Sequence, residues 1–143
     1  MAAQPQHDLG SFAAIQTDIR SDWLLRLRGL LQDAAAFDDA EVRSLIAAWD
    51  GYVRTGSPAA AILETTLREA GQAIVRRAAG EHGGILLGRG LGAAVSVGSF
   101  GYRAQALVVK ALEMAAPPWC DDKDDRDRVL RAAAARARGL PAG

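Results

Sequence analysis

Residues 45–64 read LIAAWDGYVRTGSPAAAILE, and the rest of the chain is organised around them. The apolar residues leading into this stretch recur at the three- and four-residue spacing of a helix face: Val42, Leu45, Ile46 and Trp49. We expect Gly51 to end this helix in the left-handed conformation. Ser57 should cap the next helix, with Pro58 in its first position, where the missing N–H costs nothing. By themselves, these residues describe an ordinary corner between two helices.

The same residues also resemble a segment of the penicillin amidase (penicillin acylase) family. The similar residues are Trp49-Asp50-Gly51, a short polar connection, and Ser57-Pro58-Ala59-Ala60-Ala61. In that family the segment belongs to the mainly helical part of the large chain, well downstream of the catalytic N-terminal serine. Members usually carry an acidic residue before the capping serine, where this chain has Gly56.

The composition favours closely packed helices. Half of the 143 residues are hydrophobic, only 6% are aromatic, and alanine is abundant. We expect one all-α domain over residues 1–143: an irregular bundle of about five to six helices with a Gly-rich loop at roughly 80–101. A formal net charge of zero argues against general affinity for nucleic acid or anionic lipid. There is no signal-peptide pattern, and no apolar run approaches the ~18 residues of a membrane span.

The first helix is expected from Leu9 to Leu31, with Asp8 as its N-cap. One apolar stripe supports it: Phe12, Ile15, Ile19, Trp23, Leu27 and Leu30. Residues 11–21, SFAAIQTDIRS, are a second stretch similar to the amidase family, which has an Ile-Gln-x-Asp run there. Gln16 and Asp18 are two apart and so lie on different sides of the helix. We interpret Gln16 as a structural polar anchor, with pocket lining as the alternative.

The next two helices flank the opening corner. Asp38 and Glu41 form a capping-box pattern for a helix that runs to about Asp50, with Phe37 and Val42 as its hydrophobic staple. The third helix is expected from Ser57 to about Ala79, closed by Gly80, with a Glu64–Arg68 pair on its polar side. Its predicted inner stripe is Leu63, Leu67, Ala70, Ile74 and Ala78. Gly71 in mid-helix suggests close packing by another helix.

The Gly-rich stretch contains Gly88-Arg89-Gly90-Leu91-Gly92-Ala93, which invites a phosphate-loop interpretation. A dinucleotide fingerprint needs a βαβ unit around it, and this chain offers none. A further helix is predicted from Phe100 or Tyr102 to Ala116, with Leu107, Val108, Ala111, Leu112 and Ala115 inward. Pro117-Pro118-Trp119 ends it and is a third stretch similar to the amidase family. The last helix is expected from Asp125 to Arg138, with an inner face of Val129, Leu130, Ala133 and Ala137.

Two charge clusters near the C-terminus are candidate binding sites. The aspartates 121, 122, 124, 125 and 127 suggest calcium, but Arg126 and Ala132 stand where a calcium loop needs glycine and glutamate. We therefore interpret these carboxylates as solvated helix caps and predict no metal site. An arginine face could touch phosphate: Arg126, Arg128, Arg131, Arg136 and Arg138. The neighbouring aspartates disfavour that interpretation.

Few residues of this sequence are candidates for catalysis, and we predict no catalytic residue and no cofactor. His7 and His82 have no zinc spacing, and Ser99 does not lie in a nucleophile elbow. The single cysteine, Cys120, cannot form an internal disulfide and is interpreted as a packing residue.

The resemblance implies chemistry that these residues do not supply. In the amidase family an N-terminal serine attacks an acyl amide, its own α-amino group serves as base, and an asparagine helps to hold the oxyanion. This sequence contains no asparagine. We expect a helical fragment of a larger hydrolase acting on acyl amides such as penicillins, acyl-homoserine lactones or lipopeptides, and inactive alone. The expected partner is the rest of that hydrolase, or a second copy through an exposed apolar face. The family suggests a periplasmic or extracellular parent, and the alternative is a stand-alone helical interaction module.

Overall fold

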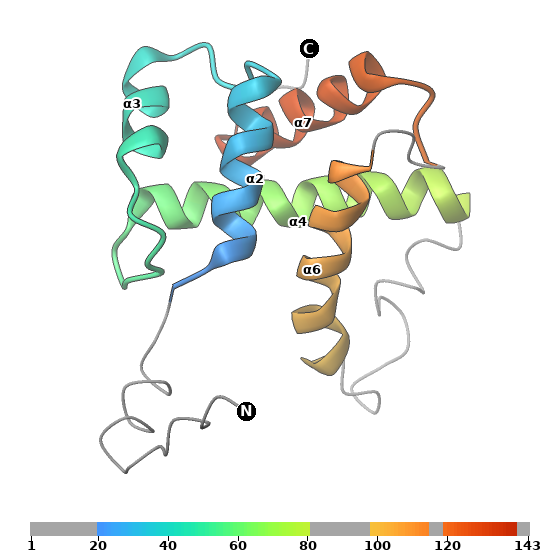
Figure 1. The fold of residues 1–143 in the computed structure, drawn as a ribbon, viewed down its shortest axis with the longest axis horizontal. Helices are drawn as coiled ribbons and strands as arrows, with labels where there is room; N and C mark the ends of the chain where they lie inside the picture. The colour runs from blue at the N-terminus through green and yellow to red at the C-terminus, as the bar shows by residue number, and fades with distance from the viewer. Residues whose placement is uncertain (1–19, 81–97, 115–118, 140–143) are drawn as a thin grey trace, which may run out of the picture.

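Five helices make up the part of the chain that the structure describes, residues 20–80, 98–114 and 119–139 (Figure 1). In this computed structural model they are α2 (Asp22–Asp33), α3 (Ala40–Ala48), α4 (Pro58–Ala79), α6 (Gly98–Glu113) and α7 (Lys123–Ala137). No strand occurs within those ranges, so the predicted all-α class is confirmed. Nor is any helix within them long and apolar enough to cross a membrane.

Helix α4 is the longest element, and α2, α6 and α7 all pack against it. Figure 1 shows α2 and α6 crossing α4, while α7 lies on another side of it. The buried side chains of these four helices form one cluster, with Leu27, Leu63, Leu112 and Leu130 fully enclosed. Because α4 contributes along most of its length, it is the axis on which the other helices are placed.

The start of α4 is as the sequence predicts. Ser57 is the N-cap, its Oγ accepts a hydrogen bond from the Ala60 N–H at 3.3 Å, and Pro58 is the first helical residue. Most of the predicted inner stripe is buried, although Ala78 at its end is exposed. Gly71 also has the predicted role, since a Cβ there would lie 3.0 Å from Val108 Cγ2 of α6.

The prediction of one helix from Leu9 to Leu31 is wrong at residues 20 and 21. Ser21 has extended backbone, and its Oγ accepts a hydrogen bond from the Leu24 N–H at 3.3 Å, so it caps a helix that begins at Asp22. Arg20 forms an isolated β-bridge with Tyr52. The buried face of α2 is Leu24, Leu27 and Leu31. Residues 8–19, with Asp8, Gln16 and Asp18, lie outside the described residues.

The boundaries of three other helices differ from the prediction. Asp39, not Asp38, caps α3 by accepting hydrogen bonds from the N–H groups of Glu41 and Val42, and α3 ends at Ala48. Helix α6 begins at Gly98, inside the predicted Gly-rich loop. Helix α7 begins two residues early because Asp122 caps it.

Two predicted side-chain placements also change. On α6, Val109 is buried, whereas Leu107, predicted to point inward, is 60% exposed. On α4, Arg68 lies 3.7 Å from Glu69 in the ion pair that the structure gives it, so the predicted pairing with Glu64 is replaced. Arg26 and Glu113 form a further ion pair that links α2 to α6.

Candidate functional site

The corner after α3 is held against α2, and against the residue that caps α2, by side-chain and backbone hydrogen bonds. The Ser21 N–H donates to the Gly51 carbonyl at 2.8 Å. Arg28 donates from Nη1 to the Trp49 carbonyl at 2.7 Å. The Trp49 indole N–H donates to the Tyr52 carbonyl at 3.0 Å, which closes the turn on itself.

Asp50 and Gly51 complete this corner. Asp50 accepts hydrogen bonds from the Arg54 guanidinium at 2.6 Å and the Tyr52 N–H at 3.0 Å, and these bonds lower the pKa of its carboxyl. Gly51 has φ of +95°, and a Cβ there would lie 2.9 Å from Leu25 Cδ1. Trp49 and Gly51 therefore join the corner to α2 and Ser21, while Asp50 stabilises the corner itself, which makes this corner a structural joint.

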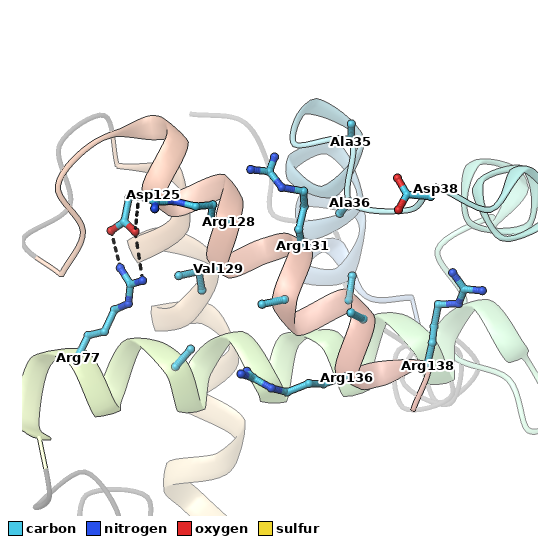
Figure 2. A pocket seen from close by; sticks show the side chains of 14 residues that line it. Ala35, Ala36, Asp38, Arg77, Asp125, Arg128, Val129, Arg131, Arg136 and Arg138 are labelled. Carbon is cyan, nitrogen blue, oxygen red and sulfur yellow. Dashed lines mark hydrogen bonds and ion pairs between the residues drawn. The ribbon is translucent and has the colours of Figure 1, made fainter. Parts of the chain in front are cut away.

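The described residues also line an open hollow of about 610 Å³ between α7, α4 and the segment that follows α2 (Figure 2). Five arginines and two aspartates contribute to its lining: Arg77, Arg128, Arg131, Arg136, Arg138, Asp38 and Asp125. Most of the remaining wall is alanine, with Val129. Its volume is within the usual range for ligand pockets, and its charged groups are mostly cationic.

One end of the hollow is built around Asp125, which is only 6% exposed. Arg77 of α4 holds both carboxylate oxygens, with Nη2 at 3.1 Å from Oδ1 (Figure 2). Arg128 Nη2 lies 3.2 Å from the same oxygen, and the Asp121 N–H donates to Oδ2 at 3.3 Å. The hydrogen bonds from Arg77 are the main reason that the pKa of Asp125 lies below its usual value.

The remaining arginines of the hollow differ in what they bind. Arg131 donates from Nη1 to the Ala34 carbonyl at 3.1 Å, and Arg138 donates from Nη2 to Asp39 at 3.1 Å. Within the described part of the chain, the side chain of Arg136 makes no hydrogen bond or ion pair. Arg126 belongs elsewhere, because it donates to the Leu112 carbonyl at 3.3 Å and pairs with Asp127. The predicted arginine face is therefore divided between two sites.

Only part of the aspartate cluster caps α7, and the prediction that all its carboxylates are solvated is wrong, because Asp125 and Asp127 are buried in ion pairs. Asp122 is the N-cap of α7, and Asp127 is buried between Lys123 and Arg126. Burial by itself would raise the pKa of Asp127, but hydrogen bonds from those two cations outweigh it and leave the pKa lowered. Across residues 20–80, 98–114 and 119–139, no group of three or more His, Cys, Asp or Glu side chains is arranged to hold a metal ion.

The remaining candidate catalytic residues either show no sign of activation or lie outside the described residues. Cys120 is half-buried, and burial raises the pKa of its thiol, which disfavours the reactive thiolate. Ser99 lies in the first turn of α6. His7, His82 and residues 88–93 lie outside the described residues.

Comparison with protein families supplies the identification. The family model for penicillin amidase matches residues 1–140. This chain belongs to the penicillin amidase family. The match includes all three stretches whose resemblance to penicillin amidases the sequence showed, and it confirms that resemblance. Comparison with curated proteins and with solved structures finds no match.

Sequence reasoning did not find the hollow of this penicillin amidase family member. Arg77 is not among the candidate binding residues that the sequence suggests, yet it binds Asp125, 48 residues away in the sequence. The α7 arginines form a cluster in the sequence, but the alanine wall from α7, α4 and the segment after α2 depends on how the helices pack. No local signal in the sequence could have revealed it.

Proposed function

We propose that this chain is one helical domain of a penicillin amidase-like hydrolase, where it supports the catalytic part and walls one side of the acyl pocket. The family match over residues 1–140 carries the proposal. The activity is hydrolysis of an acyl amide C–N bond by an N-terminal serine that lies outside these 143 residues. The absence of asparagine supports this division, because the family's oxyanion-holding side chain then also comes from outside.

The catalytic steps belong to the proposed parent enzyme. The serine hydroxyl attacks the acyl carbonyl while the serine α-amino group takes its proton, and the amine leaves. Water then releases the acid from the acyl-enzyme. The helical domain would contribute a rigid boundary that orients the acyl group, because small misplacements of a bound substrate reduce the rate strongly.

The outer face of α6 is the proposed contact with the rest of the hydrolase. Leu107 is 60% exposed and Met114 is 48% exposed. Leu107 lies within α6, and Met114 directly follows Glu113, the last residue of α6. We assign these two exposed apolar side chains to the contact because an interface with the catalytic part would bury apolar surface.

The decisive experiment compares the 143-residue chain alone with the same chain co-expressed with the catalytic part encoded beside it. A chromogenic acyl anilide reports amide hydrolysis. We expect no turnover by the chain alone and turnover by the reconstituted pair, which is lost when the N-terminal serine is replaced by alanine. Turnover by the chain alone would contradict the proposal.

A variant of the α6 face separates this function from the alternative, a stand-alone interaction module. Leu107→Ser should weaken assembly with the catalytic part while leaving the helical content of the isolated chain unchanged. Arg68→Ser, on an exposed part of α4, is the matched control. If the gene encodes no catalytic part and Leu107→Ser instead abolishes binding to an unrelated protein, the interaction module is correct.

A further inference from the structure

The arginine-lined hollow has more cationic groups than its own carboxylates neutralise. Five arginines, set against the two lining aspartates and Asp39, which pairs with Arg138, leave an excess of two positive charges, in a chain whose total formal charge is zero. Asp125 is already engaged by Arg77 and Arg128, and Asp39 by Arg138. The excess positive charge is therefore local, and it attracts a negatively charged group from outside.

Hydrogen-bond donors remain available on this surface. A guanidinium carries five N–H donors, and Arg131 uses one of its groups on the Ala34 carbonyl. Arg136 uses none on the described residues, and it is exposed. Planar guanidinium groups bind carboxylates through paired hydrogen bonds, which are stronger than hydrogen bonds between neutral groups.

The shape of the hollow favours an elongated ligand over a compact anion. The arginines that line it from α7 extend from successive parts of the helix (Figure 2). At 1.5 Å and about 100° per residue, Arg128 and Arg136 lie about 12 Å apart along the axis and about 80° apart around it, whereas Arg131 lies about 140° around the helix from Arg136. Side chains on one face of an extended peptide recur roughly every 6.6 Å, within the range that long arginine side chains can meet. The alanine wall between them accommodates peptide backbone and methylene groups.

We propose that this hollow binds an extended acidic polypeptide segment, with carboxylates held by Arg128 and Arg136 over the alanine wall. A second copy presenting the same hollow would be repelled, because both surfaces are cationic. The proposal is independent of the hydrolase function: it concerns a face formed by α7, α4 and the segment after α2, whereas the proposed hydrolase contact lies on α6.

The test measures binding of a fluorescein-labelled seven-residue peptide of alternating Glu and Ala to the full chain by fluorescence anisotropy. A Gln–Ala peptide is the neutral control. We expect the Glu peptide to bind at least about fivefold more tightly, and its affinity to fall at high salt because surface charges are screened. Equal binding of the two peptides, or no binding of the Glu peptide at millimolar concentration, would overturn the proposal.

Arg136→Glu locates the site, and Arg68→Glu is its matched control because both variants change the net charge equally. Arg68 is exposed on α4, paired only with Glu69, and does not line the hollow. Arg136→Glu should weaken binding at least about fivefold and Arg68→Glu less than about twofold. Arg136→Lys should fall between them, because an ammonium group keeps the charge but cannot make the paired hydrogen bonds. Circular dichroism checks the fold, and Arg136→Gln replaces Arg136→Glu if that variant unfolds.

Two further measurements distinguish other occupants. The first is binding of inorganic phosphate or citrate. If either anion binds more tightly than the peptide, and Arg136→Glu abolishes that binding, the hollow is a small-anion site and the peptide proposal is rejected. Sedimentation that shows self-association abolished by Arg136→Glu, without peptide binding, would identify a contact between copies and likewise reject it.

Discussion

Arg77 of α4 and Asp125 of α7 are 48 residues apart in the sequence, yet Arg77 holds both oxygens of the Asp125 carboxylate. Asp125 is buried, whereas the Arg77 side chain is 40% exposed. The pair links the last turn of α4 to the first turn of α7, the two helices that share the most extensive packing. It therefore sets where α7 begins on α4, and with it one end of the arginine-lined hollow.

This ion pair predicts how stability depends on pH. The folded-state pKa of Asp125 lies below the usual value of about 3.9 for an unfolded chain, so folding favours the ionised carboxyl. The stabilisation is present above the unfolded pKa and is lost as pH falls through the folded pKa. In urea unfolding at pH 7, 5, 4 and 3, Asp125→Asn should be less stable than wild type at pH 7 and show a smaller loss on acidification. Asp33→Asn, at an exposed site ending α2, should keep the wild-type profile; an unchanged profile in Asp125→Asn would contradict this role.

The joint between α2 and α3 predicts a large effect of one methyl group. Gly51→Ala places a Cβ 2.9 Å from Leu25 Cδ1 at a φ of +95°, so it should cost about 3 kcal/mol of stability. Gly56→Ala is the control, because it has a φ of +79° with open space around it and should cost only about 1 kcal/mol of backbone strain. Chemical denaturation measures both, and equal losses would show that Leu25 is not the constraint.

The contact between α4 and α6 predicts non-additive stabilities. Gly71→Ala gains about 1 kcal/mol of helix propensity but forces its Cβ to 3.0 Å from Val108 Cγ2. The substitution should therefore fail to stabilise the wild type and should stabilise the Val108→Ala variant by about 1 kcal/mol. A double-mutant cycle in urea measures the coupling, and additive effects would refute the close approach.

The cap at the start of α4 predicts a smaller effect. Ser57→Ala removes the acceptor for the Ala60 N–H and should cost about 1 kcal/mol, visible as a lower thermal midpoint. Thr55→Ala, at an exposed position two residues earlier, should leave the midpoint nearly unchanged. Similar shifts in both variants would mean that the loop as a whole, and not the cap, matters.

The features that were predicted correctly from the sequence depend on nearby residues. Ser57-Pro58 fixes the start of α4 because its capping chemistry lies within four residues. The long helix and its inner stripe follow from apolar spacing over many turns. The capping residue of α3 was wrong by one position, because Asp38 and Asp39 are equivalent in sequence and only Asp39 accepts the Glu41 N–H.

The features that were missed depend on distant residues. The apolar pattern of the sequence runs through Ser21 without a break, but the backbone at Ser21 is extended. A hydrogen bond to Gly51 and the bridge between Arg20 and Tyr52 support that extended backbone. Leu107, Val108 and Val109 are consecutive apolar residues, so periodicity alone could not show that Val109 is the buried one. The hollow needs side chains from three separate segments, and its recognition required the packed helices.

The dependence of α4 on α7 has a consequence for how the protein is made. Ribosomes add about 5–20 residues per second, and roughly sixty residues separate the end of α4 from the end of α7. Leu67, Ala70 and Ile74 are therefore synthesised several seconds before the last helix is complete. During that interval the growing chain carries an incompletely covered apolar surface, which is the kind of surface that molecular chaperones bind. Shortening the delay, by moving α7 ahead of α6 in a permuted gene, should reduce aggregation of the newly made protein.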